Sequence, residues 1–172
     1  TTARHPLRRA ISWFFHSWHR DFLWSAPAPQ DPARVDELVD GFHERLPTTL
    51  GVCDRWFDEE LAAVTGHDVF SRPFDGDGGW ELRRLDGCDL AIVRTEDLDG
   101  AFAPMCAALL GTTVKLERVN EASGKPYRDL RRAFLARFEL TEVERRAVAA
   151  TRHARHFYSA EELEAGMDLS PR

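Results

Sequence analysis

The segment Asp89–Arg94 constrains the fold most, because Leu90 to Val93 form an unbroken apolar run between polar ends. Such a run is typical of a strand that is covered on both faces, as in parallel sheets flanked by helices. Thr95-Glu96-Asp97 then supply helix-capping side chains, and apolar residues recur at helical spacing until Gly111, a typical C-terminal stop. This strand, turn and helix unit predicts an α/β fold.

The first residues repeat this arrangement and add a candidate binding site. A strand end that delivers Arg4 is followed by Pro6, which suits the first turn of a helix because its fixed φ fits there. Arg8, Ser12 and His16 then follow one polar stripe of that helix. An arginine, a helix N-terminus and a hydroxyl on one side form an anion pocket. The alternative, that these arginines are solvated or paired with carboxylates, stays open on spacing alone.

The other elements follow from periodicity, prolines and turn residues. We expect helices from Pro6 to about Trp24, from Asp31 to Pro47, and from about Thr49 to Val64. Further strands are expected over Trp80–Leu85 and Thr113–Val119. The residues after Lys125 are expected to be helical, with a core stripe of Tyr127, Leu130, Phe134 and Phe138 and with capping boxes at Thr141/Glu144 and Ser159/Glu162.

Size and composition exclude several classes of protein. With 172 residues, 43% of them hydrophobic, residues 1–172 are expected to form a single domain. The formal charge of -6 argues against a nucleic-acid partner. Neither a long apolar run nor a charged leader is visible, so we expect no transmembrane segment and a cytoplasmic protein. The sequence starts without methionine, in what we interpret as the last residues of a strand, and we expect an upstream segment.

Three segments in register resemble the nucleotide-dependent sulfotransferases. They are Arg4-His5-Pro6 with Ser12 eight positions on, Ala91 to Leu98 with the closing Leu109-Leu110-Gly111, and Asn120 to Tyr127 continuing to Arg155–Glu162. The third is closest to a bacterial branch described as capsular polysaccharide synthesis proteins. The resemblance covers nearly the whole chain. It departs from the family in that the strand and lysine-bearing phosphate loop expected before Arg4 are missing, and His5 stands where an acidic residue is common.

The resemblance implies a helix-rich, three-layer, P-loop-like α/β fold with a small parallel sheet, truncated at its N-terminus. It also implies transfer of a sulfonate from 3′-phosphoadenylyl sulfate to a hydroxyl or amine of a saccharide or small-molecule acceptor. Arg4 and Ser12 would hold the 3′-phosphate of this donor. A non-catalytic nucleotide- or saccharide-binding scaffold that has lost the donor loop is the alternative.

The remaining candidate residues each have two interpretations. Arg8 contacts the nucleotide or is a solvated charge, and Lys125 reaches the nucleotide or is a flexible surface lysine. His16 is the candidate general base for the acceptor's proton, or an ordinary interfacial histidine. His153 and His156 are spaced like zinc ligands, but no convergent cysteine or carboxylate supports a site, and we predict no metal.

Overall fold

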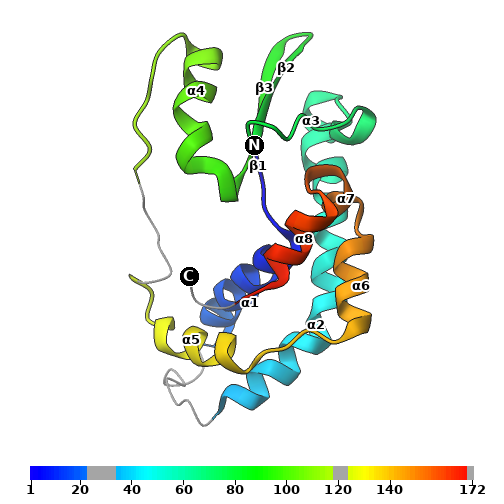
Figure 1. Cartoon of the computed structure of the whole chain (residues 1–172), viewed down its shortest axis with the longest axis vertical. Helices are drawn as coiled ribbons and strands as arrows, with labels where there is room; N and C mark the ends of the chain where they lie inside the picture. Colours follow the sequence, from blue (N-terminus) through cyan, green and yellow to red (C-terminus); the bar gives the residue numbers. More distant parts are fainter. Residues whose placement is uncertain (23–33, 118–123, 170–172) are drawn as a thin grey trace.

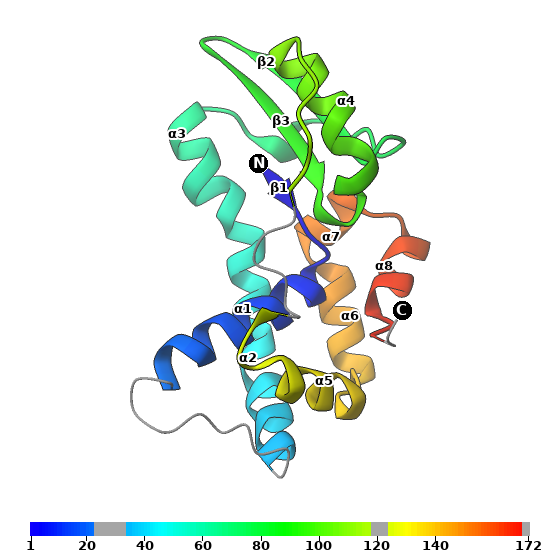
Figure 2. The same ribbon diagram turned by 90° about the vertical axis from the view of Figure 1, so that its left-hand side faces the viewer.

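A computed structural model describes residues 1–22, 34–117 and 124–169. A small sheet with one long helix against it lies at one end of the molecule, and a group of packed helices lies at the other (Figure 1). Figure 2 shows that the first strand leads from the sheet directly into this helical group. The N-terminal strand and its turn therefore lie where the two parts meet.

The sheet has three strands, β1 (Thr2–Ala3), β2 (Trp80–Leu85) and β3 (Cys88–Arg94), in the order β1-β3-β2. β1 runs parallel to β3, whereas β2 runs antiparallel to it. The prediction of a small parallel sheet is therefore wrong, and the sheet is mixed. The reason is the tight turn at Asp86-Gly87, where Gly87 has a φ of +90°, because so short a connection can join only antiparallel neighbours.

β3 is covered on both faces, as its apolar run predicts. On one face, Val93 packs against Ala101, Met105 and Cys106 of α4 (Leu98–Leu110). On the other face, Leu90 and Ile92 of β3 form a buried cluster with Phe57, Val69 and Phe157. A 3-10 turn, Thr95–Asp97, links β3 to α4, and Gly111 ends α4 in the left-handed conformation.

The helical group is built on α1 (Pro6–Phe22) and α2 (Val35–Trp56). A π-helical turn, Phe57–Ala62, and the short α3 (Ala63–Thr65) extend α2. Its other members are α5 (Arg128–Arg137), α6 (Glu142–Ala150), α7 (Arg152–Phe157) and α8 (Ala160–Met167).

Phenylalanine rings lock the helices of this group together. Phe42 of α2 lies 5.3 Å from Phe14 of α1 and 5.4 Å from Phe134 of α5, measured between ring centroids. Both contacts are edge-to-face, the geometry that aromatic pairs prefer. The predicted stripe of α5 is confirmed, with Leu130, Phe134 and Phe138 buried. Both predicted capping boxes are also present, at the starts of α6 and α8.

Two other predictions are wrong. α2 does not end at Pro47 but continues through it to Trp56, because buried residues on both sides of the proline form one apolar stripe: Leu38, Phe42, Leu46, Leu50 and Cys53. Residues 113–117 form no strand, and Val114, one of their two apolar residues, is 38% exposed. The rest of that predicted strand, the end of the first helix at Trp24 and the start at Asp31 lie outside the described residues.

Candidate anion-binding site

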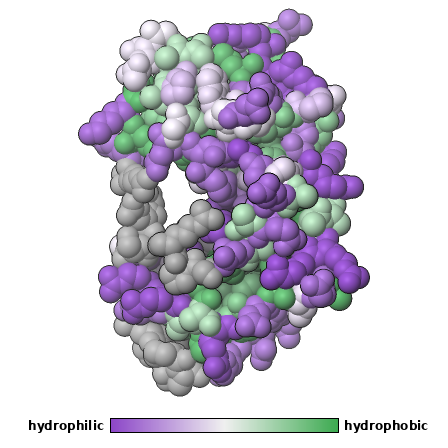
Figure 3. All heavy atoms as spheres, in the orientation of Figure 1, coloured by the Kyte–Doolittle hydropathy of each residue, from purple (hydrophilic) through white to green (hydrophobic). Residues whose placement is uncertain are grey.

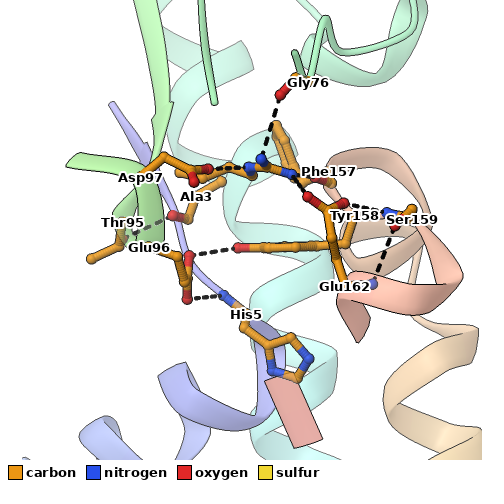
Figure 4. Close-up of polar contacts among 11 residues, drawn as sticks. Ala3, His5, Gly76, Thr95, Glu96, Asp97, Phe157, Tyr158, Ser159 and Glu162 are labelled. Atoms are coloured by element: carbon orange, nitrogen blue, oxygen red, sulfur yellow. Dashed lines mark hydrogen bonds and ion pairs between the residues drawn. The ribbon is translucent and has the colours of Figure 1, made fainter. Parts of the chain in front are cut away.

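The turn between β1 and α1 is fixed at three consecutive residues. The Thr95 hydroxyl donates to the Ala3 carbonyl (2.8 Å), and the His5 N–H donates to Oε1 of Glu96 (2.9 Å), as Figure 4 shows. Nε2 of the buried His153 lies 3.0 Å from the Arg4 carbonyl. Because a carbonyl oxygen can only accept, this nitrogen carries the proton. The backbone that presents the Arg4 side chain is thus held from two directions.

Glu96 connects this turn to the end of α7. Its second oxygen, Oε2, accepts the hydroxyl of Tyr158 at 3.0 Å. Burial, and then the neighbouring Glu96 carboxylate, raise the pKa of Tyr158, so the phenol stays protonated and acts as a donor. Each carboxylate oxygen of Glu96 therefore accepts one hydrogen bond, Oε1 from the His5 N–H and Oε2 from the Tyr158 hydroxyl (Figure 4).

The His5 ring lies beneath the turn, against α8. Its Nε2 is 3.1 Å from the Leu163 carbonyl, and burial lowers its pKa. Gly166 makes this packing possible, since a methyl group added there would lie 2.6 Å from Nε2 of His5. The buried His5 ring therefore packs the start of α1 against α8.

Arg94, the last residue of β3, is the polar centre of the same region. It binds Asp97 and Glu162 and also donates to the carbonyl oxygens of Phe157 (3.2 Å) and Gly76 (3.4 Å). Burial alone would lower the pKa of Arg94, but the bonds to Asp97 and Glu162 outweigh it and raise the pKa. This arginine is fully engaged in holding the sheet to the C-terminal helices.

Three other arginines, Arg4, Arg8 and Arg131, form what we term the arginine cluster. Burial lowers the pKa of the half-buried Arg4 guanidinium; Glu96 offsets part of this effect, and Arg8 adds to it. Burial also lowers the pKa of Arg131, and Arg4 and Arg8 lower it further. Arginine remains protonated in proteins, so these shifts mean that the charged groups are less stable here than in water. A bound anion would relieve that cost.

A cavity of about 410 Å³ lies beside Arg8. His5, Glu96, Tyr158 and Gly166 contribute to its wall, together with Arg94. In Figure 3, hydrophilic residues lie on this face of the molecule below α4, on the side of α1 and α8. Arg8 is thus the member of the arginine cluster that lines space which a ligand can enter.

The sequence-predicted residues lie as follows. Arg4 and Arg8 are neighbours, and Nη2 of Arg8 donates to the Asp168 carbonyl at 2.9 Å. Ser12 is half-buried one helical turn beyond Arg8, and the exposed His16 is a turn further along α1. Lys125 is in the turn before α5, where its carbonyl accepts the N–H of Arg128 at 3.0 Å. The role assigned to each residue stays a prediction.

Sequence reasoning missed Arg131, and it did not recognise His153 and Tyr158 as contacts of the first turn. For Arg131 a signal existed, because this residue lies between Leu130 and Phe134 on the predicted core stripe and so borders the interior. For the other two no local signal exists, since only the fold brings them to Arg4 and Glu96. Among the described residues, no group of three or more His, Cys, Asp and Glu side chains could hold a metal ion.

A protein-family model described as "Putative capsular polysaccharide synthesis protein" matches residues 35–159. The chain belongs to this family. The matched region contains Arg94, Glu96, Arg131 and Tyr158 and leaves out β1 and α1. No curated protein and no solved structure gives a significant match. None of the described helices is both long enough and apolar enough to cross a membrane.

Proposed function

We propose that this family member takes part in capsular polysaccharide synthesis as a sulfotransferase with a P-loop-like fold. It would transfer a sulfonate from 3′-phosphoadenylyl sulfate to a hydroxyl or amine of a saccharide or small-molecule acceptor. The observation that carries the proposal is the position of Arg4: a strand delivers it to the start of a long helix, half-buried beside Arg8. Its guanidinium makes no hydrogen bond or ion pair to the described residues.

The chemistry of these residues fits the 3′-phosphate of the donor. A guanidinium offers a planar pair of donors to phosphate oxygens, and such charge-assisted bonds are stronger than neutral ones. The free N–H groups at the start of α1 add a partial positive charge. Thr95, Glu96 and His153 already fix the backbone around Arg4. Binding a ligand therefore costs little conformational entropy of this backbone.

The donor, when bound, supplies the activated sulfonate, and the protein's own groups position it. In this proposal Arg4 and Ser12 bind the 3′-phosphate, and Arg8 and Lys125 add positive charge around the nucleotide. His16 would take the proton from the acceptor; it is exposed, so an acceptor can reach it. By analogy with phosphoryl transfer, alignment and cationic stabilisation account for most of the catalysis.

Binding of adenosine 3′,5′-bisphosphate, measured by calorimetry, tests this assignment. The substitution Arg4→Ala removes charge-assisted bonds and should weaken binding about 10- to 100-fold. The matched control is Arg132→Ala, which removes an exposed arginine paired with Asp129 and should leave the affinity unchanged. Equal affinity in wild type and the Arg4→Ala variant would refute the phosphate site.

The second candidate is a binding module without catalysis. In this candidate the half-buried Arg4 and its neighbour Arg8 bind the anion, and no residue acts on an acceptor. This protein would bind the bisphosphate but would transfer no sulfonate from labelled donor to saccharide acceptors. Transfer that depends on Arg4 would eliminate this candidate.

A further inference from the structure

We propose that Arg131 is a third cationic ligand of the site that contains Arg4 and Arg8, and that the three guanidinium groups together select a dianionic phosphate monoester. The inference rests on the proposed function and deepens it, because it adds a ligand from α5 and explains what kind of anion the site prefers. A singly charged phosphodiester or sulfate ester would leave part of the positive charge without compensation.

The packing of α5 against α1 places Arg131 toward the cluster. Tyr127 stacks on Phe15 of α1 with ring centroids 5.6 Å apart, and Phe134 meets the same ring edge-on at 5.3 Å. Arg131 lies one helical turn from each of these two residues and so shares their face of α5. Arg8 lies two turns before Phe15 on the matching face of α1. Residues from two helices and the β1 turn therefore converge.

Arg131 differs from every other arginine of α5 in having no carboxylate partner among the described residues. Arg128 and Arg132 pair with Asp129, and Arg137 pairs with Asp36. The three paired arginines are exposed, whereas Arg131 is half-buried. An arginine that only served solubility would be expected in the opposite arrangement, solvated or paired. Arg131 instead lies close enough to Arg4 and Arg8 to be repelled by both.

The electrostatics of the cluster fit a ligand with two charges. Arg4 and Arg8 both lower the pKa of Arg131, so each guanidinium is repelled by the others. Glu96 offsets part of the repulsion at Arg4, but its oxygens already accept the His5 N–H and the Tyr158 hydroxyl. The two other carboxylates beside the cavity, Asp97 and Glu162, are bound by Arg94. The arginine cluster therefore keeps an excess of positive charge. Like charges held together destabilise a fold and are kept where a ligand compensates for them.

The decisive variant is Arg131→Met, which keeps the length of the side chain and removes its charge. In calorimetry it should bind adenosine 3′,5′-bisphosphate about 10- to 100-fold more weakly than wild type. Its own melting temperature without ligand should equal or exceed that of wild type, because a repulsion is removed. The control Arg132→Met should change neither quantity. A variant that melts lower without ligand and binds with wild-type affinity would overturn the inference.

Inorganic phosphate separates this inference from the proposed function. Phosphate should raise the melting temperature of wild type more than chloride at equal ionic strength, and Arg131→Met should lose most of that difference. If phosphate stabilises wild type through Arg131 but adenosine 3′,5′-bisphosphate binds no more tightly than phosphate, the role of the arginine cluster in phosphate binding is supported and the nucleotide assignment is refuted. If phosphate does not stabilise wild type, both fail. Arg131→Lys, which keeps the charge, should retain part of the effect and covers the case in which Arg131→Met does not fold.

Discussion

His153 combines an acid-sensitive side chain with a contact to the site. Its ring is fully buried, stacks on Phe57 at 5.7 Å between centroids, and bonds the Arg4 carbonyl through Nε2. Its own backbone N–H donates to Asp54 at 2.8 Å, which fixes the start of α7. Nδ1 has no partner, so a second proton on this ring would be buried without an acceptor.

We therefore expect acid to destabilise the protein through His153. Burial lowers its pKa to about 4, whereas the unfolded chain titrates near the ordinary value of 6.5. Between pH 4 and 6.5 the unfolded state therefore binds more protons than the folded state. The contribution of the neutral His153 to the free energy of unfolding is fully present above pH 6.5 and is lost as the pH falls toward 4. The loss amounts to about 3 kcal/mol. His5 and His156, whose pKa values burial also lowers, act in the same direction.

Urea unfolding between pH 4 and 7 measures this effect. The substitution His153→Gln keeps an N–H donor without a titrating ring and should flatten part of the slope of unfolding free energy against pH. The same slope in both proteins would show that His153 does not carry the effect.

Among the elements, α2 shows tertiary packing overriding a local rule. Pro47 cannot donate to the carbonyl one turn earlier and its ring crowds that turn, yet the helix passes through it. The burial of Leu46 and Leu50 on either side keeps the helix continuous, since breaking it would expose both. The same packing leaves Pro47 itself exposed, so nothing in the core depends on its ring.

Pro47→Ala should accordingly stabilise the protein. The alanine restores the missing N–H donor and removes the clash, which we expect to add about 1 kcal/mol or more to the free energy of unfolding. Calorimetric melting gives the comparison, with Val64→Ala, a nearly fully exposed position in α3, as a substitution that should have little effect. A lower melting temperature for Pro47→Ala would mean that the helix uses the proline.

Periodicity predicted the elements that bury their own apolar face, such as β3, α4 and α5. It failed where the outcome depends on a neighbour. Residues 113–117 alternate like a strand, but the described sheet offers them no pairing partner. Arg4 and Arg8 could be chosen from sequence because helical spacing alone relates them. The predicted stripe could place Arg131 at the border of the interior, but its position beside Arg4 and Arg8 could not be predicted, because it depends on how α5 packs on α1.

At the scale of the whole molecule, Arg94 is the main polar connection between the sheet and the helices. It joins β3 to the segment before β2 through Gly76, to α7 through Phe157 and to α8 through Glu162. Its side chain is 9% exposed, while those of Asp97 and Glu162 are 36% and 44% exposed. Water therefore screens the partners in part, and the network contributes less than a fully buried one.

Arg94→Met should lower the free energy of unfolding by about 2 kcal/mol, because the carbonyl acceptors are left without donors. Arg84→Met is the matched control: this arginine of β2 also binds a carboxylate, but it is 62% exposed and should contribute within about 0.5 kcal/mol. Urea titrations followed by circular dichroism compare the two. An equal decrease in the free energy of unfolding for both variants would show that Arg94 stabilises the fold no more than an exposed arginine does.

The bonds that fix the β1 turn also set the order in which the site can form during synthesis. Ala3, Arg4 and His5 are held by residues 92, 149 and 91 positions later in the chain. A ribosome delivers the N-terminus first, so the first arginines emerge long before their supports. Contacts of such long range form late in folding. The arginines of the first turn are consequently synthesised well before the residues that fix them, and the backbone around Arg4 is fully held only when α7 has reached the fold.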